Sequence, residues 1–256
     1  MSHKENAKII CVTNQKGGVS KTTTTYNLSA EFALNGHKTL MIDLDGQASL
    51  TLSCGYNPLD FSMTMADVID GSTDLKNIIT HTDIIDLDLA PASIKLVKSE
   101  VLMQTAFSRE QILKSRLKSV SQYYEYIFID CGPSLGILPI NALAASDYVI
   151  IPTATNPMST YALDDLMATI QQVAAINSNL KVLGTIATMF HTSTKIDREQ
   201  LQYIKENTNL IGTIKYGTAA SKGLEQGLPA VVACPNEDVA KQYKETALKI
   251  MQMVEE

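Results

Sequence analysis

The residues best suited to chemistry form one glycine-rich segment near the N-terminus. It comprises Lys16, Gly17, Gly18, Val19, Ser20, Lys21, Thr22 and Thr23. Because it follows an apolar stretch and opens a stretch of helical period, its backbone amides could bind phosphates. We therefore expect a nucleotide site in which Lys21 neutralises the β and γ phosphates and the Thr22 hydroxyl binds Mg²⁺. A polar strand-to-helix turn is the alternative.

Two further apolar stretches end in carboxylates that suit the same chemistry. Residues 39–42 lead into Asp43 and Asp45, and side chains at positions i and i+2 of a strand point the same way. Residues 126–129 lead into Asp130, an arrangement typical of an aspartate that holds Mg²⁺ through water. In doubly wound sheets this edge faces the ligand. The alternatives are turn-capping acids for the first pair and a simple strand end for Asp130.

These segments together resemble the ParA and MinD family of ATPases over roughly the whole chain. The glycine-rich segment resembles the deviant Walker A motif KGGxxK[ST], residues 43–47 its Walker A′ element, and residues 130–134 its Walker B and switch region. The resemblance implies ATP and Mg²⁺ as cofactors, and a sandwich homodimer in which Lys16 reaches the partner's nucleotide. It assigns Asp45 to the attacking water and Asp43 to a supporting role. The expected catalytic residues are thus Lys16, Lys21 and Asp45, and the expected metal residues are Thr22, Asp43 and Asp130.

Three positions depart from the family pattern. Ser20 stands where the family usually has glycine, Gly46 replaces the usual proline, and Gly132 occupies the position of a second proline. If the backbone at Ser20 needs a positive φ, the serine costs on the order of 1 kcal/mol and could slow turnover. Gly46 is expected to loosen the backbone around it.

Apolar runs rich in β-branched residues alternate with stretches of helical period. Strands are expected at residues 8–13, 38–42, 84–89, 126–129, 148–151, 182–188 and 210–214, and helices at 21–34, 108–120, 161–176, 195–207 and 236–254. Ser108 with Gln111 fits a capping box, and Gly36 fits the end of the first helix. The pattern predicts an α/β fold with a mostly parallel central sheet and helices on both faces.

Composition limits the domain count and the cellular context. A chain of 256 residues that is 45% hydrophobic suits one ATPase domain, predicted over residues 1–256 without an N-terminal helix-turn-helix domain. No apolar run is long enough to span a membrane and residues 1–8 are polar, so a cytoplasmic protein is expected. A net charge of −6 would repel DNA if evenly spread, so DNA binding would need a local basic patch.

The last third of the chain is where the family places its base and DNA contacts. By position, Lys215, Tyr216 and Gly217 would border adenine, whereas Ala219 stands near the place of a DNA-binding arginine. Substitute DNA contacts are Lys215, Lys222, Lys241, Lys244 and Lys249, with a solvated charged face as the alternative. Residues 194–197 match a guanine-reading TKxD string, which we interpret as a helix start.

The resemblance predicts ATP-switched partition of plasmid or chromosomal DNA. ATP would close the dimer, which would bind nonspecific DNA and associate with the nucleoid. A ParB-like centromere-binding partner would then stimulate a weak ATPase. A positioning ATPase for a non-DNA cargo or membrane surface is the main alternative. The chain ends at Glu255 and Glu256, so no stable membrane association is expected. An ATPase with a metal cluster shared across the dimer is not expected either, because Cys131 lacks a suitably placed second cysteine.

Overall fold

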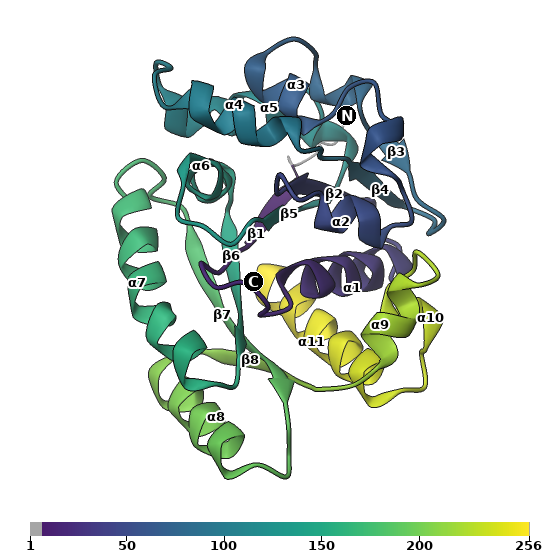
Figure 1. Cartoon of the computed structure of the whole chain (residues 1–256), viewed down its shortest axis with the longest axis vertical. Helices are drawn as coiled ribbons and strands as arrows, with labels where there is room; N and C mark the ends of the chain where they lie inside the picture. Colours follow the sequence, from purple (N-terminus) through teal and green to yellow (C-terminus); the bar gives the residue numbers. More distant parts are fainter. Residues whose placement is uncertain (1–6, 256) are drawn as a thin grey trace.

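The computed structural model describes residues 7–255 and is built on one eight-stranded sheet (Figure 1). Residues 1–6, which carry most of the segment used to argue against a signal peptide, lie outside the described part. The strands are β1 (Lys8–Val12), β2 (Thr39–Leu44), β3 (Thr80–His81), β4 (Leu87–Ala90), β5 (Tyr126–Cys131), β6 (Tyr148–Ala154), β7 (Lys181–Phe190) and β8 (Leu210–Lys215). Their order is β3-β4-β2-β5-β1-β6-β7-β8, and only β3 is antiparallel to its neighbour.

The central strands are buried along almost their whole length because both faces of the sheet are covered. Along β1, Ile10 and Val12 enter one core, whereas Cys11 enters the other. Along β5, Tyr126 and Phe128 enter the first core, whereas Ile127 and Ile129 enter the second. This alternation explains why the strands appear in the sequence as continuous hydrophobic runs.

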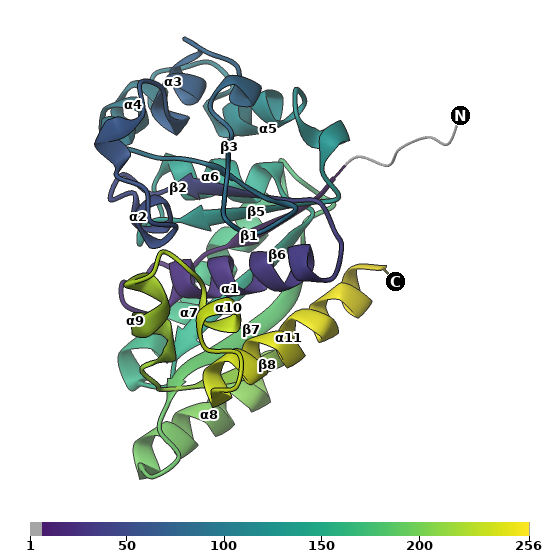
Figure 2. The ribbon, with the colours of Figure 1, turned by 90° about the vertical axis from the view of Figure 1, so that its right-hand side faces the viewer.

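Helices lie on both faces of the sheet, which confirms the predicted fold class (Figure 2). One face carries α1 (Lys21–Leu34), α9 (Ala219–Leu224), α10 (Ala230–Ala233) and α11 (Asp238–Glu255). The other face carries α3 (Met65–Asp70), α4 (Lys95–Met103), α5 (Ile112–Leu117), α6 (Ile137–Ala145) and α7 (Pro157–Val173). The short α2 (Ser49–Ser53) follows β2, and α8 (Lys195–Asn207) packs against β7 and α7. No helix in the described part is both long and apolar enough to cross a membrane.

The topology places the glycine-rich segment at the point where the sheet changes direction. The chain leaves β1 for β2 on one side of the sheet, and β6 lies on the other side of β1. The carboxyl end of β1 is therefore a topological switch point, where open α/β sheets bind ligands. Asp43 of β2 and Asp130 of β5 are paired in the sheet register and reach this same edge.

The predicted helix at residues 108–120 is wrong at both ends, because residues 118–120 form a turn. Residues Arg109–Gln111 form a 3-10 turn, and the α-helix there is only α5. The capping box predicted at Ser108 is also wrong, because Ser108 has φ 50° and its side chain makes no cap hydrogen bond. A capping box is instead formed by Thr64 with Asp67 at the start of α3. Gly36, with φ 90°, follows α1 as predicted.

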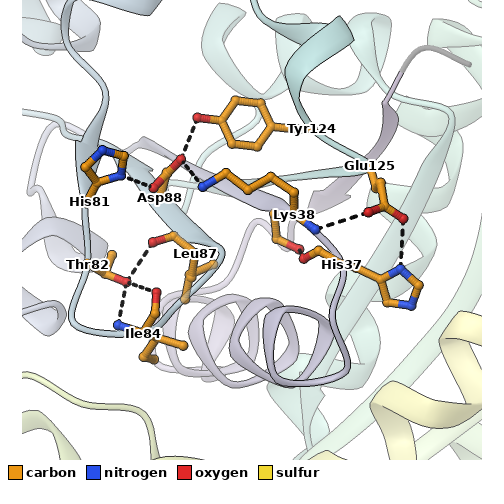
Figure 3. Close-up of polar contacts among 10 residues, drawn as sticks. His37, Lys38, His81, Thr82, Ile84, Leu87, Asp88, Tyr124 and Glu125 are labelled. Atoms are coloured by element: carbon orange, nitrogen blue, oxygen red, sulfur yellow. Dashed lines mark hydrogen bonds and ion pairs between the residues drawn. The ribbon is translucent and has the colours of Figure 1, made fainter. Parts of the chain in front are cut away.

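A polar network closes the opposite, amino-terminal edge of the sheet (Figure 3). The buried Asp88 carboxylate of β4 contacts the Lys38 ammonium at 2.8 Å and His81 Nδ1 at 2.6 Å, and it accepts a hydrogen bond from the Tyr124 hydroxyl at 2.8 Å. Burial alone would raise the pKa of Asp88, but these three partners hold it below its ordinary value. The network ties β4 and its antiparallel neighbour β3 to the segments that enter β2 and β5.

Candidate nucleotide site

The glycine-rich loop is anchored to three other elements. Asn14 donates its amide to a carbonyl of β6 at 2.8 Å and accepts from the Lys16 backbone amide at 3.0 Å. Gln15 donates to a carbonyl of α7 at 2.8 Å, and Thr188 of β7 donates to the Val19 carbonyl at 3.1 Å. These bonds fix the loop before any ligand arrives.

Ser20 confirms the strain anticipated from the sequence. It has φ 61° and ψ 31°, the left-handed conformation that favours glycine, and its side chain makes no cap hydrogen bond. Gly18, two residues earlier, also has a positive φ of 72°. The loop therefore requires two left-handed residues, and only one of them is a glycine.

Lys21 lies at the first position of α1 with its ammonium turned back into the loop. Its Nζ donates to the Lys16 carbonyl at 2.8 Å, and the residue is buried. Burial lowers its pKa, and the carboxylate of Asp130 opposes that shift. The ammonium thus sits inside the loop where phosphates would lie, while the Lys16 side chain makes no hydrogen bond or ion pair within residues 7–255.

Asp130 is completely buried behind the loop and is held by two hydroxyls of α1. Thr22 donates to one carboxylate oxygen at 2.7 Å and Thr25 donates to the other at 3.1 Å. Burial raises its pKa from the ordinary 3.8 to about 8, the Asp43 charge adds to this, and the two hydroxyls oppose it. A carboxylate this poorly solvated gains from a nearby cation, as the predicted Mg²⁺ role requires.

Asp43 is also buried, and its carboxylate is already occupied by protein donors. The Thr51 amide and hydroxyl donate to one oxygen at 2.8 and 2.7 Å, and the Asp45 amide donates to the other at 3.2 Å. Its pKa rises to about 6, chiefly through burial. This geometry favours the supporting role predicted for Asp43 over a direct place at a metal.

Asp45 extends into the open site, and two glycines shape its surroundings. Its carboxylate accepts from the Gln47 amide at 2.9 Å and lies against Gly132, where a Cβ would come within 3.2 Å of it. At Gly46, a Cβ would lie only 2.6 Å from Val97 Cγ2 of α4. The two departures from the family prolines thus make room for neighbouring side chains, so the space at Gly46 is filled rather than loose.

These residues surround a hollow of about 390 Å³ on the carboxyl edge of the sheet. Its lining comprises Gly17, Gly18, Val19, Ser20, Lys21, Thr22, Thr23, Asp45, Gln47, Ser49, Ser53, Pro133 and Leu224. Three lining residues were not predicted from the sequence: Ser49 and Ser53 of α2 and Leu224 of α9. Nothing local marks them, because the fold brings them together through a contact between Gly55 and Gly227.

The residues predicted to border adenine are not part of this lining. Lys215 ends β8 and forms an ion pair with Asp238 at 2.9 Å. The Tyr216 ring stacks on His191 with centroids 4.7 Å apart, and Gly217 packs close to Val239. The assignment of these three residues to adenine stays a prediction, and the apolar side chains that line the hollow are Val19, Pro133 and Leu224.

The five lysines predicted to contact DNA fall into two groups. Lys215 is paired with Asp238, and Lys222 lies 3.6 Å from Glu237. Lys241, Lys244 and Lys249 are exposed on α11, where Lys249 reaches a backbone carbonyl at 3.5 Å. Within the described residues, none of these three has a carboxylate within 4.0 Å. Of these five lysines, the three without an acidic partner in the described chain therefore all lie on α11.

Comparison with known proteins identifies the family. A family model described as an AAA domain matches residues 7–182. The chain is 35% identical over 247 residues to the sporulation initiation inhibitor protein Soj of Bacillus subtilis, which covers 95% of this chain and 98% of that protein. The chain belongs to the ParA/MinD family of partition ATPases. This ParA-type chain is also 35% identical to the chromosome-partitioning ATPase Soj of Treponema pallidum, over 85% of this chain and 88% of that one.

A solved structure shows the same fold around a bound nucleotide. Cobyrinic acid a,c-diamide synthase from Mycobacterium smegmatis, with ADP and magnesium, matches the ParA-type chain with a TM-score of 0.84 at 28% identity. The match covers 97% of this chain and 96% of that one. The donors here fit magnesium, because Thr22 and Asp130 offer hydroxyl and carboxylate oxygens, the ligands that this ion prefers.

Proposed function

We propose that this ParA-like ATPase is a DNA-partition switch that binds ATP and Mg²⁺ in the hollow around Lys21. The observation that carries the proposal is the shared position of the fixed phosphate loop, Asp130 and Asp45 at one edge of the sheet. Bound Mg²⁺ would neutralise charge on the phosphates. Lys21 would hold the β and γ phosphates, and Asp45 would orient the water that attacks the γ-phosphorus. The bond from that phosphorus to the β–γ bridging oxygen breaks, giving ADP, phosphate and a proton.

The switch itself would be a sandwich dimer closed by ATP. Lys16 is a suitable contact to a second copy because its backbone is held by Asn14 and Lys21 while its ammonium is not bound by the described residues. Reaching a partner's nucleotide would add positive charge to the γ-phosphate in the closed state. The closed dimer would bind DNA without sequence preference, and a ParB-like centromere-binding protein would stimulate hydrolysis and release.

The first experiment measures DNA binding by the purified chain with ATP, ADP or no nucleotide at two salt concentrations. Binding that requires ATP and weakens with salt is expected, because phosphate contacts release counterions. Lys21→Ala should abolish the ATP-dependent DNA binding, and GTP should not replace ATP for the parent chain. Lys16→Ala should still bind nucleotide but stay monomeric in analytical ultracentrifugation. An ATP-dependent dimer without DNA binding would exclude the DNA role and leave a positioning ATPase with another cargo.

A further inference from the structure

Helix α4 contacts the catalytic loops through one side and leaves another side uncovered. Four residues separate it from the end of β4, at the same edge of the sheet as the phosphate loop. Leu96, Ser99 and Met103 are buried against the domain, and Ser99 donates to the Ala66 carbonyl of α3 at 3.3 Å. Both ribbon views show α4 at the periphery of the molecule (Figures 1 and 2).

The start of α4 lies directly on the two loops that carry the catalytic acids. Val97 Cγ2 occupies the place of a Cβ at Gly46, next to Asp45. One turn later, the Glu100 carboxylate lies over Gly136, so close that a Cβ there would overlap it. The Ala92 amide, just before α4, donates to the Thr51 hydroxyl at 3.0 Å, and Thr51 holds Asp43. A shift of α4 would therefore displace the loops that follow Asp45 and Asp130.

The outer side of α4 is apolar and uncovered. Ile94, Val97 and Val101 follow helical spacing and are 60%, 48% and 64% exposed, and Leu102 beside them is 56% exposed. Phe107, just beyond the helix, is fully exposed. Isolated apolar residues on a surface are ordinary, but this group lies within fourteen positions, residues 94–107, and beside a catalytic loop.

The charges on the outer side of α4 indicate what kind of partner could bind there. Lys95 and Lys98 are exposed here, and neither has a carboxylate within 4.0 Å in the part of the chain that the structure describes. Glu100, the one acid in residues 94–107, is turned inward to Gly136. In a chain of net charge −6, this is a local cationic surface with an apolar centre. An acidic segment with apolar side chains at helical spacing would satisfy both features, whereas DNA would leave the apolar residues without a partner.

We propose that the outer face of α4, formed by Ile94, Lys95, Val97, Lys98, Val101 and Leu102, docks an acidic, apolar segment of a partner protein. Occupancy of this face changes ATP hydrolysis, because α4 rests on the loops of Asp45 and Asp130. The regulatory half of the proposal rests on the proposed function, whereas docking itself does not.

The test selects short random peptides, displayed on phage, against the immobilised full chain. Enriched peptides should combine Asp or Glu with apolar residues three or four positions apart. A synthetic peptide of the enriched sequence should bind Val101→Asp at least about tenfold more weakly than the parent, since a charge would enter the centre of the contact. Ile85→Asp, at an exposed apolar residue in the turn before β4, is the matched control and should bind as the parent does.

Three outcomes would overturn docking: enriched peptides without acidic residues, binding unaffected by Val101→Asp, or Val101-dependent binding of DNA or of phosphatidylglycerol vesicles in place of peptide. The peptide should also change the rate of ATP hydrolysis by the parent and not by Val101→Asp. An unchanged rate would overturn the regulatory half. If the chain hydrolyses ATP and binds DNA but selects no acidic peptide, the docking proposal alone is refuted. If the chain selects the peptide but shows no ATP-dependent DNA binding, the proposed function alone is refuted.

Discussion

At the scale of single residues, the site combines strained backbone with buried charge. Ser20 takes a conformation suited to glycine, and Asp130 is ionisable yet completely buried. Both features cost folding free energy, and both lie where nucleotide and Mg²⁺ are expected. Binding of a ligand that stabilises these residues would recover part of that cost.

Ser20→Gly should stabilise the chain by about 1 kcal/mol, because glycine adopts positive φ without steric cost. For a chain of this size, that corresponds to a rise in Tm of roughly 2–4 °C. Ser20→Ala is the matched control, since it removes a hydroxyl that makes no cap hydrogen bond and keeps the strain. Thermal unfolding of the three proteins without nucleotide gives the comparison. Equal gains from glycine and alanine would show that the backbone conformation is not the cause.

Asp130→Asn should stabilise the Mg²⁺-free chain, increasingly so as pH rises. The pKa of Asp130 is about 8 in the folded chain and 3.8 ordinarily, so folding favours the protonated carboxyl. The stability that this protonation contributes is fully present below pH 3.8 and is lost as pH rises to about 8. The gap in Tm between variant and parent should widen from pH 5 to pH 8 and then level off. Mg²⁺ with ATP should stabilise the parent and not the variant. The exposed Asp164→Asn should follow the parent at every pH.

At the scale of elements, the sequence predicted the strands and helices that form the phosphate site, and the structure confirms them. β1, α1, β2 and β5 carry strong periodic patterns and occur within one or two residues of the expected bounds at most ends. Helix α4 escaped prediction because its two apolar sides, one buried and one exposed, blur the helical period. Ser53 and Leu224 escaped because their position depends on a contact between distant loops, which no local pattern encodes.

Gly46→Ala should lower both stability and the rate of ATP hydrolysis, because its Cβ would lie 2.6 Å from Val97 Cγ2 and push the loop of Asp45 away from α4. A stability loss of about 1–2 kcal/mol is expected for such overpacking. Val97→Ala removes the obstructing methyl, so the double variant should recover most of the loss. A cycle of the two single variants and the double variant, measured by urea unfolding and by phosphate release, isolates the coupling. Additive effects would show that Gly46 and Val97 do not act on each other.

At the scale of the whole molecule, an acidic chain that binds DNA must concentrate its cations on one surface. Of the five lysines considered for this role, two are held by acids, Lys215 by Asp238 and Lys222 by Glu237. Lys241 and Lys244 lie on the exposed side of α11 without such partners in the described chain. A paired lysine must give up its carboxylate to bind a phosphate, so the unpaired lysines contribute more to affinity.

The double variant Lys241→Ala, Lys244→Ala should therefore weaken ATP-dependent DNA binding severalfold and lower the slope of log affinity against log salt by about 2, one for each lost phosphate contact. Lys215→Ala, Lys222→Ala removes the same formal charge from paired positions and should change that slope far less. The Lys241→Ala, Lys244→Ala pair should leave ATP hydrolysis without DNA intact, since neither side chain lines the hollow. Fluorescence anisotropy with a labelled duplex across a salt series measures all three proteins. If the paired lysines proved the stronger contributors, the DNA surface would lie where β8 meets α9, and the exposed side of α11 would be an ordinary solvated face.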